Sequence, residues 1–290
     1  MIGVFCYCLN DSNRISARIP DKDLFTFYKS EEEDMRGYIF DLDGTVYLGD
    51  KMIEGAAETI RTLRERGDKV VFLSNKPIAT RQSYSEKLTK MGIPTRVEDV
   101  LNSSLIVARY LQKKLQPGEK VYVIGEQPIH DELHEHGIPI TGDSVRPDYV
   151  VLSWDRQFTY DKLNLVYQAA VSGSKIIASN PDATCPLDNG QIPDTGTFIA
   201  ALEAATGRSI DLVVGKPSLI AAEAAVEHLG LKYEDCFMIG DRLETDIKMG
   251  NDAGMASVLV LTGVATAEMA AASEFKPRHV IPSIKEIVRL

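Results

Sequence analysis

The sequence predicts an α/β protein: a parallel sheet covered by helices, with a second α/β unit inserted into it. Two observations support this. From Gly37 onward, short runs of β-branched and aromatic residues alternate with helical stretches, a pattern typical of a parallel sheet covered on both faces. In addition, the interval between Asn75 and Lys216 is far longer than a connection needs and contains its own strand and helix pattern.

The elements of the main sheet follow from this alternation. A strand at 38–40 is followed by a helix, and most of the later apolar runs are also strands followed by helices. The expected strands are 38–40, 69–75, 211–217, 235–241 and 256–263, and the expected helices are 54–67, 80–92, 98–115, 218–230 and 244–254.

The inserted unit should span residues 117–211. Its expected strands are 120–126, 148–154 and 174–180, and its expected helices are 127–137 and 159–173. Residues 35–116 and 212–290 would then form the core domain. Residues 1–34 are polar and mostly aperiodic, so we interpret them as an N-terminal extension of unknown role; Met35 could be the natural start, or the extension could be an extra surface helix.

Composition excludes several classes of function. The net charge is −10 and the pI is near 5.1, which disfavours a nucleic-acid or membrane-surface role. No apolar run reaches the length of a membrane span, and the N-terminus does not resemble a secretory signal. The four cysteines (Cys6, Cys8, Cys185 and Cys236) fit neither a zinc site nor a disulfide framework. A cytoplasmic protein is therefore expected.

Polar residues follow four of the expected strands. They are Asp41 and Asp43, Ser74 and Asn75, Lys216, and Asp241 with Asp246. Each alone could be an ordinary turn or capping residue. Because ligands of such sheets bind beyond the carboxyl ends of the strands, we expect these residues to meet at one edge of one sheet.

Grouped carboxylates require a cation. A set of oxygen ligands without histidine or cysteine suits Mg²⁺. A phosphate group of the substrate can complete the coordination shell of this ion. Lys216 would reduce repulsion between the carboxylates and an incoming phosphate. Ser74 and free backbone N–H groups after Asp41 would donate to the phosphate oxygens. In this interpretation one aspartate of the first pair is ligand and nucleophile, and its neighbour transfers protons.

The stretches "DLDGT", "FLSN", "GKP" and "GDRLETD" resemble, in this order, the four motifs of the haloacid dehalogenase (HAD) superfamily of phosphohydrolases. The resemblance covers Gly37 to about Leu290 and implies a Rossmann-like, HAD-like core with an inserted α/β cap. It implies that Asp41 is the nucleophile that forms an aspartyl-phosphate, and that Asp43 is the general acid and base.

The same resemblance implies the remaining roles in the core. Ser74 and Lys216 would hold the phosphoryl group, and we place Gly44, Thr45 and Asn75 in the same phosphate-binding set. Mg²⁺ would be bound by the side chains of Asp41 and Asp241 and by the backbone carbonyl of Asp43, with support from Asp246.

The long insertion, with "SNPDATCP" closing its last strand, is similar to the NagD-like group of p-nitrophenyl-phosphatases and sugar phosphatases. This implies that the loop of Asn180, Asp182 and Cys185 faces the substrate. Without the resemblance, the loop would be interpreted as a plain proline turn. The implied substrate is a small phosphate ester. A sugar phosphate is favoured over pyridoxal phosphate, phosphoglycolate and nucleoside monophosphates, and a homodimer through the cap is expected.

Three alternatives stay open. The protein could be a non-catalytic phosphosugar- or magnesium-binding regulator, although such a module would not need Asp43. His130, His134 and His136 include a pair at metal-binding spacing, but a solvated helix face is favoured. Trp154, the only tryptophan, is expected to pack in the cap core rather than stack on a substrate.

Overall fold

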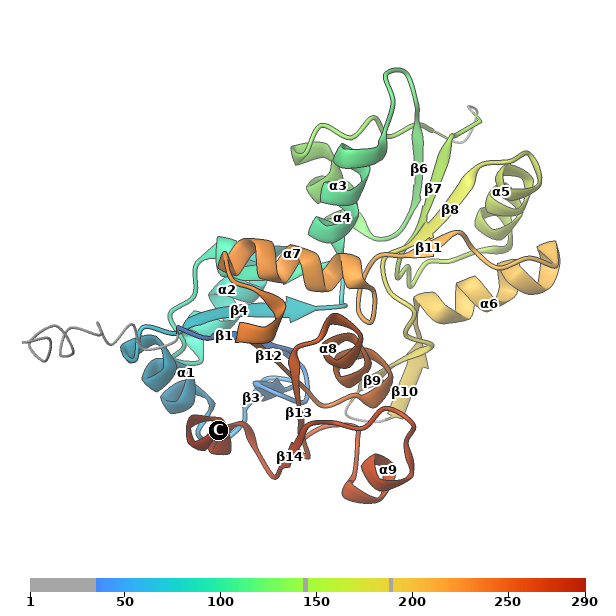
Figure 1. Cartoon of the computed structure of the whole chain (residues 1–290). Coiled ribbons are helices and arrows are strands. Elements are labelled where there is room, and N and C mark those ends of the chain that lie inside the picture. The colour runs from blue at the N-terminus through green and yellow to red at the C-terminus, as the bar shows by residue number, and fades with distance from the viewer. Residues whose placement is uncertain (1–34, 143–145, 188–189) are drawn as a thin grey trace, which may run out of the picture. The chain divides into compact units, whose positions relative to one another are not determined.

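The structure is a computed structural model that describes residues 35–142, 146–187 and 190–290, and it contains two separate parallel sheets (Figure 1). The N-terminal extension predicted for residues 1–34 lies outside the described residues, as do Cys6 and Cys8. In the described part of the chain, no helix combines the length and the apolar character that a membrane crossing requires.

The larger sheet has six parallel strands in the order β14-β13-β12-β1-β4-β5. The strands are β1 (Gly37–Phe40), β4 (Lys69–Ser74), β5 (Val100–Asn102), β12 (Cys236–Gly240), β13 (Ala256–Val260) and β14 (His279–Ile281). The four residues of β1 are all buried, as are the five of β12. Continuous burial of this kind is expected where helices cover both faces of a parallel sheet.

Helices pack on the two faces of this sheet and form two hydrophobic clusters. The helices of these clusters are α1 (Ala56–Glu65), α2 (Arg81–Lys90), α3 (Ser103–Lys114), α7 (Leu219–Leu229) and α8 (Lys248–Ala253). α9 (Ala267–Ala272) belongs to a smaller cluster, and helical turns lie at η1 (Val97–Asp99), η2 (Tyr233–Asp235), η3 (Leu243–Ile247) and η4 (Ile284–Arg289). Side chains contribute to one cluster from α1 and α2 and to the other from α3 and α7. Thr80 and Ser218 cap α2 and α7, which explains where these helices begin.

The prediction of one helix over residues 98–115 was wrong at its N-terminal end. Val100, Leu101 and Asn102 form β5, which pairs with β4 before α3 begins. Asn102 ends the strand and caps α3, because its side chain accepts a hydrogen bond from the N–H of Leu105 at 3.0 Å. The apolar strand runs directly into an apolar helix without a turn residue, so periodicity alone could not separate them.

The smaller sheet has four parallel strands in the order β11-β8-β7-β6. Its strands are β6 (Val121–Ile124), β7 (Tyr149–Leu152), β8 (Lys175–Ala178) and β11 (Leu212–Val213), and its segment carries α4 (Gln127–Glu135), α5 (Tyr160–Val171) and α6 (Thr195–Thr206). Two hairpins complete the described elements: β2 (Tyr47–Leu48) with β3 (Lys51–Met52), and β9 (Thr184–Leu187) with β10 (Gly190–Pro193). A Rossmann-like core with an inserted α/β cap, the predicted fold class, is confirmed.

One strand belongs to a different sheet from the one predicted. The run 211–217 was expected in the larger sheet, but β11 pairs with β8 through Leu212–Ile177 and Val213–Ala178. A strand of two half-buried residues carries no pattern that favours one parallel sheet over the other. The predicted boundary at residue 212 would leave β11 in the core, so we propose instead that the cap extends to Val213.

Candidate active site

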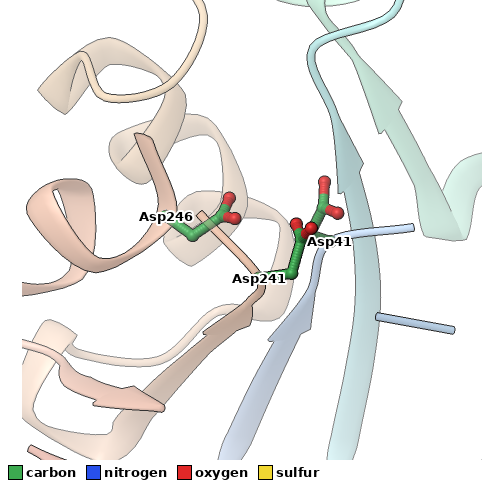
Figure 2. Close-up of side chains that lie close together, drawn as sticks. All are labelled: Asp41, Asp241 and Asp246. Atoms are coloured by element: carbon green, nitrogen blue, oxygen red, sulfur yellow. The ribbon is translucent and has the colours of Figure 1, made fainter. Parts of the chain in front are cut away.

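Three aspartate side chains converge at one edge of the larger sheet (Figure 2). Asp41 directly follows β1, Asp241 directly follows β12, and Asp246 lies in η3. Carboxylate oxygens of all three lie within 4.8 Å of one another, and they are the only such acidic, histidine or cysteine group found among the described residues. All three are buried, with 8%, 1% and 0% of their surfaces exposed.

The register of the sheet places the first two aspartates side by side. Phe40 lies opposite Ile239 in the parallel pair of β1 and β12, and the N–H of Asp41 donates to the carbonyl of Ile239 at 2.8 Å. Glycines provide the space for Asp241. A Cβ atom would lie 2.4 Å from its Oδ2 if placed on Gly44, whose φ is +88°, and 1.9 Å if placed on Gly263. A larger residue at either position would displace the carboxylate.

Lys216 lies within this cluster and contacts two of its carboxylates. Its Nζ lies 2.6 Å from Oδ1 of Asp41 and 2.6 Å from Oδ1 of Asp246. Burial by itself would lower the pKa of this lysine, but the two carboxylates raise it above its ordinary value. Lys216 reaches the cluster from β11, in the smaller sheet, so the predicted single sheet edge is built from two sheets.

The electrostatics of the cluster favour a bound cation. Burial raises the pKa of Asp41 to about 6 even with Lys216 beside it, and burial together with Asp41 and Asp246 raises the pKa of Asp241 to about 8. Oδ2 of Asp241 accepts a hydrogen bond from the N–H of Val264 at 2.7 Å, while its buried Oδ1 has no partner among the described residues. A buried carboxylate oxygen without a partner is costly unless a cation binds it. The donor set, oxygen only, fits Mg²⁺.

Asp43 is paired with a residue to which the sequence analysis gave no role. Nζ of Lys76 lies 2.5 Å from Oδ2 of Asp43. Burial would lower the pKa of Lys76, but the charge of Asp43 and the hydrogen bond to it raise it. A cation directly after the second motif, opposite a pair of aspartates, was the signal that could have identified Lys76 as a site residue.

Ser74 ends β4 and Asn75 follows it; both line the same cavity, but their contacts differ. Nδ2 of Asn75 donates to Oδ2 of Asp182 at 2.9 Å and to the carbonyl of Lys216 at 3.0 Å, and its Oδ1 accepts from the N–H of Lys216 at 2.9 Å. These contacts occupy the amide. Asn75 therefore fits a role in linking core and cap better than the predicted role in phosphate binding, whereas Ser74 remains a candidate phosphate donor.

The backbone groups after Asp41 are less free than predicted. The N–H of Gly44 donates to the carbonyl of Tyr47 at 2.7 Å, and the N–H of Thr45 donates to the carbonyl of Leu42 at 3.3 Å. These bonds close the turn that follows β1, so the backbone N–H groups of Gly44 and Thr45 are not free donors, whereas the buried hydroxyl of Thr45 has no partner among the described residues. Among the described residues, no hydrogen bond engages the backbone N–H or carbonyl of Asp43. These two groups are thus available for a phosphate oxygen and a metal.

The loop after β8 brings two of its three predicted residues to the cavity. Asp182 and Cys185 line the cavity. Asn180 is 1% exposed and instead donates to Oδ2 of Asp182 at 3.1 Å and to Oδ1 of Asp194 at 3.2 Å. Asn180 therefore supports the loop from within. The loop is more than a plain proline turn, because its side chains also contact the core.

The cavity between core and cap has a volume of about 340 Å³. Besides the predicted residues, its lining includes Lys76, Thr184, Gln191, Asp194 and Arg242, which sequence reasoning missed. No aromatic or histidine side chain lines it within the described residues. Trp154 packs with Cys185 and Phe198, and its Nε1 donates to the carbonyl of Pro193 at 2.9 Å, which confirms its predicted packing role.

Comparisons with known proteins agree with this fold and site. Residues 38–139 match a family model described as haloacid dehalogenase-like hydrolase, and residues 213–287 match a HAD-hydrolase-like model. The sugar-phosphatase AraL of Bacillus subtilis is 42% identical over 254 residues, which cover 88% of this chain and 92% of that protein.

Three solved structures share the fold. The 4-nitrophenylphosphatase of Thermotoga maritima has a TM-score of 0.83 at 34% identity, covering 89% of this chain and 98% of that one. NagD of Escherichia coli K-12 has a TM-score of 0.79 at 30% identity, covering 87% and 98%. Glycerol phosphate phosphatase of Mycobacterium tuberculosis, in complex with magnesium, has a TM-score of 0.81 at 29% identity, covering 88% and 76%.

A cap-bearing α/β core with clustered aspartates and a buried lysine, shared with enzymes of this kind, defines a phosphatase. The chain belongs to the haloacid dehalogenase-like family, and its relatives include the NagD and p-nitrophenylphosphatase group.

Proposed function

We propose that this protein is a magnesium-dependent phosphomonoesterase that hydrolyses small sugar or polyol phosphates through an aspartyl-phosphate on Asp41. The observation that carries the proposal is the arrangement of Asp41 and Asp241, buried side by side with one carboxylate oxygen of Asp241 unpartnered, on the wall of a cavity that reaches Lys216. This arrangement is suited to a cation and a phosphate group together.

Mg²⁺ would be held by the side chains of Asp41 and Asp241 and by the backbone carbonyl of Asp43, with Asp246 behind them. When bound, it would neutralise the carboxylates and the phosphate oxygens. The magnesium complex of the Mycobacterium tuberculosis relative supports this assignment. Lys216, between Asp41 and Asp246, would keep the nucleophile in position and offset the charge of the phosphate.

Two residues of the chain carry the reaction. A carboxylate oxygen of Asp41 forms a bond to phosphorus while the bond from phosphorus to the leaving oxygen breaks, and Asp43 gives its proton to that oxygen. Asp43 then takes a proton from a water molecule, which attacks the aspartyl-phosphate and releases inorganic phosphate. Lys76, 2.5 Å from Asp43, fixes the direction of that carboxylate.

The residues that line the cavity favour a substrate with a small neutral leaving group. Thr184 and Gln191, whose side chains contact each other at 2.9 Å, offer hydroxyl and amide groups for sugar hydroxyls. Asp194, which has no cationic partner among the described residues, would repel the carboxylate of phosphoglycolate. Without an aromatic side chain in the described lining, the base of a nucleotide or the ring of pyridoxal phosphate has no surface on which to stack.

Two further expectations belong to this proposal. Cys185 and Cys236 are both buried, and we expect the cytoplasm as the site of action. We also expect two copies to associate through the cap. Light scattering on the purified protein tests the association, and a monomer at micromolar concentration would contradict it.

The test is phosphate release from a panel of phosphorylated metabolites, with Mg²⁺ and with EDTA, ranked by kcat/KM. We expect Mg²⁺-dependent turnover with sugar and polyol phosphates ahead of nucleotides, pyridoxal phosphate and phosphoglycolate. No turnover at any pH from about 5 to 9, the range in which such acid–base chemistry operates, would favour the alternative of a non-catalytic binding protein.

A further inference from the structure

A second cavity adjoins the first. Its volume is about 620 Å³, and it also lies between the cap loop and the core. Four residues line both cavities: Asp182, Thr184, Arg242 and Thr245. The side chains of these residues thus form a common wall between the phosphate site and the second cavity.

An ion pair joins two of the four residues of this wall. Nη1 of Arg242 lies 3.4 Å from Oδ1 of Asp182. The other oxygen of Asp182 is held by the side-chain amides of Asn75 and Asn180, at 2.9 and 3.1 Å. Asp182 is therefore fixed from two sides, whereas Asp182 is the only hydrogen-bond partner of the Arg242 guanidinium among the described residues. The arginine side chain is thus held by fewer hydrogen bonds than the aspartate.

The two cavities differ in character. Both linings mix polar and apolar groups, but no ring lines the first cavity among the described residues. Phe275 lines the second, beside the apolar Val213 and Pro217 and the charged Glu244 and Lys248, and the ammonium of Lys248 lies 5.3 Å from the centre of the Phe275 ring. A flat aromatic group would find in the second cavity the aromatic contact that the first one lacks.

We propose that the Asp182–Arg242 pair is a specificity wall that confines leaving groups to the first cavity. When the pair opens, the second cavity becomes continuous with the phosphate site and admits phosphate monoesters that carry an aromatic base, such as nucleoside 5′-monophosphates. This inference rests on the proposed function, because it concerns the leaving group of the same reaction. It assigns to Arg242 a role in selection by size, beyond its backbone contact with Asp246.

The experiment compares two substrates within each variant, so that any common loss of catalysis cancels. The kcat/KM for adenosine 5′-monophosphate is divided by that for glycerol 3-phosphate. This ratio should rise at least about tenfold in Arg242→Ala and in Asp182→Asn, since removing a steric or charged obstacle typically changes discrimination by this much. Arg156→Ala is the matched control: Arg156 pairs with Glu126 on the cap and lines neither cavity, so the ratio should stay unchanged.

Phe275 tests where the base goes. Phe275→Leu keeps the apolar packing of this side chain against its neighbours but removes the ring. In the wild type it should leave both kcat/KM values unaltered, whereas combined with Arg242→Ala it should remove most of the gain for adenosine 5′-monophosphate. An unchanged ratio in both wall variants, or a gain that survives the loss of the ring, would overturn the proposal.

A binding measurement separates this inference from the proposed function. In the Asp41→Asn background with Mg²⁺, titration calorimetry with adenosine 5′-monophosphate should show at least about tenfold tighter binding when Arg242→Ala is added. If the wild type hydrolyses no phosphate ester, the proposed function is wrong. This titration still tests whether the Asp182–Arg242 pair excludes adenosine 5′-monophosphate. Circular dichroism checks each variant, and Asp182→Asn replaces Arg242→Ala if the latter does not fold.

Discussion

Two regions meet at the cavity, and they are built differently. In the acidic cluster, Asp41 and Asp241 are placed by the register of two adjacent strands, and Lys216 contacts two carboxylates at 2.6 Å. In the cap-loop wall, Asp182 contacts side chains from distant parts of the chain, and its ion pair with Arg242 is 3.4 Å long. Backbone register thus places the acidic cluster, while side-chain contacts between the two sheets form the wall that we propose limits the substrate.

The largest loss of activity is expected from replacing the proposed nucleophile, Asp41. Asp41→Asn should reduce kcat by at least about 10⁴-fold, because a neutral amide does not attack phosphorus and no other group can replace it. Steady-state phosphate release with Mg²⁺ measures this, using protein prepared without any contact with wild-type material. Activity well above trace would mean that the reaction does not pass through Asp41.

The loss of activity on replacing Asp43 should depend on the leaving group of the substrate. Asp43→Asn should slow release of a sugar alkoxide by about 10² to 10⁴-fold, since that oxygen needs a proton, and slow the first step with p-nitrophenyl phosphate much less. With p-nitrophenyl phosphate, hydrolysis of the intermediate should become limiting. Rapid mixing should then show a burst near one equivalent per site. Equal losses for both substrates without a burst would restrict Asp43 to shaping the metal site.

Asp241 should control the magnesium requirement. Asp241→Ala should raise the Mg²⁺ concentration for half activity by at least about tenfold, because a direct ligand is lost. Metal-free thermal stability should stay unchanged or rise, since repulsion in the cluster is relieved. Asp235→Ala is the matched control, because Asp235 is exposed at the other end of β12. An unaltered Mg²⁺ response in Asp241→Ala would remove this carboxylate from the metal.

Asn75 tests the connection between the two regions. Asn75→Ala should lower kcat/KM by about three- to tenfold, because its amide links Asp182 to Lys216 and does not reach the phosphate. Ser74→Ala should cost about 10²-fold, as expected for loss of a donor to the transferred group. Parallel kinetics of the two variants decide this. A loss from Asn75→Ala as large as that from Ser74→Ala would return Asn75 to the phosphate site.

The smallest expected effect is the pH dependence of the thermal stability. The raised pKa values of Asp41, about 6, and Asp241, about 8, mean that the folded metal-free protein binds more protons than the unfolded chain. Its stability should therefore fall as pH rises from about 4 to about 8. Mg²⁺ should raise Tm by a few degrees more at pH 8 than at pH 5. Thermal melts with Mg²⁺ and with EDTA measure this, and Asp241→Ala should reduce the difference. An equal Mg²⁺ effect at both pH values would contradict the raised pKa values.

The sequence by itself determined the α/β fold class, the clustered aspartates and their grouping with Lys216. These features depend on local patterns: an apolar strand followed at once by a polar residue brings that residue to the ligand-binding edge of a parallel sheet. Asp41, Ser74 and Asp241 lie where this rule places them, because β1, β4 and β12 are adjacent in one sheet.

Only the tertiary structure decided which segments far apart in sequence meet. The short strand β11 joins β8 instead of the larger sheet, so Lys216 enters the site from the cap side. Asn75 contacts Asp182 across 107 residues of chain, and Asp182 contacts Arg242 across 60. Such pairings depend on the packing of two sheets against each other, and that packing leaves no periodic signal in the sequence of either partner. For this reason the class of enzyme could be predicted from the sequence, and the boundaries of the substrate cavity could not.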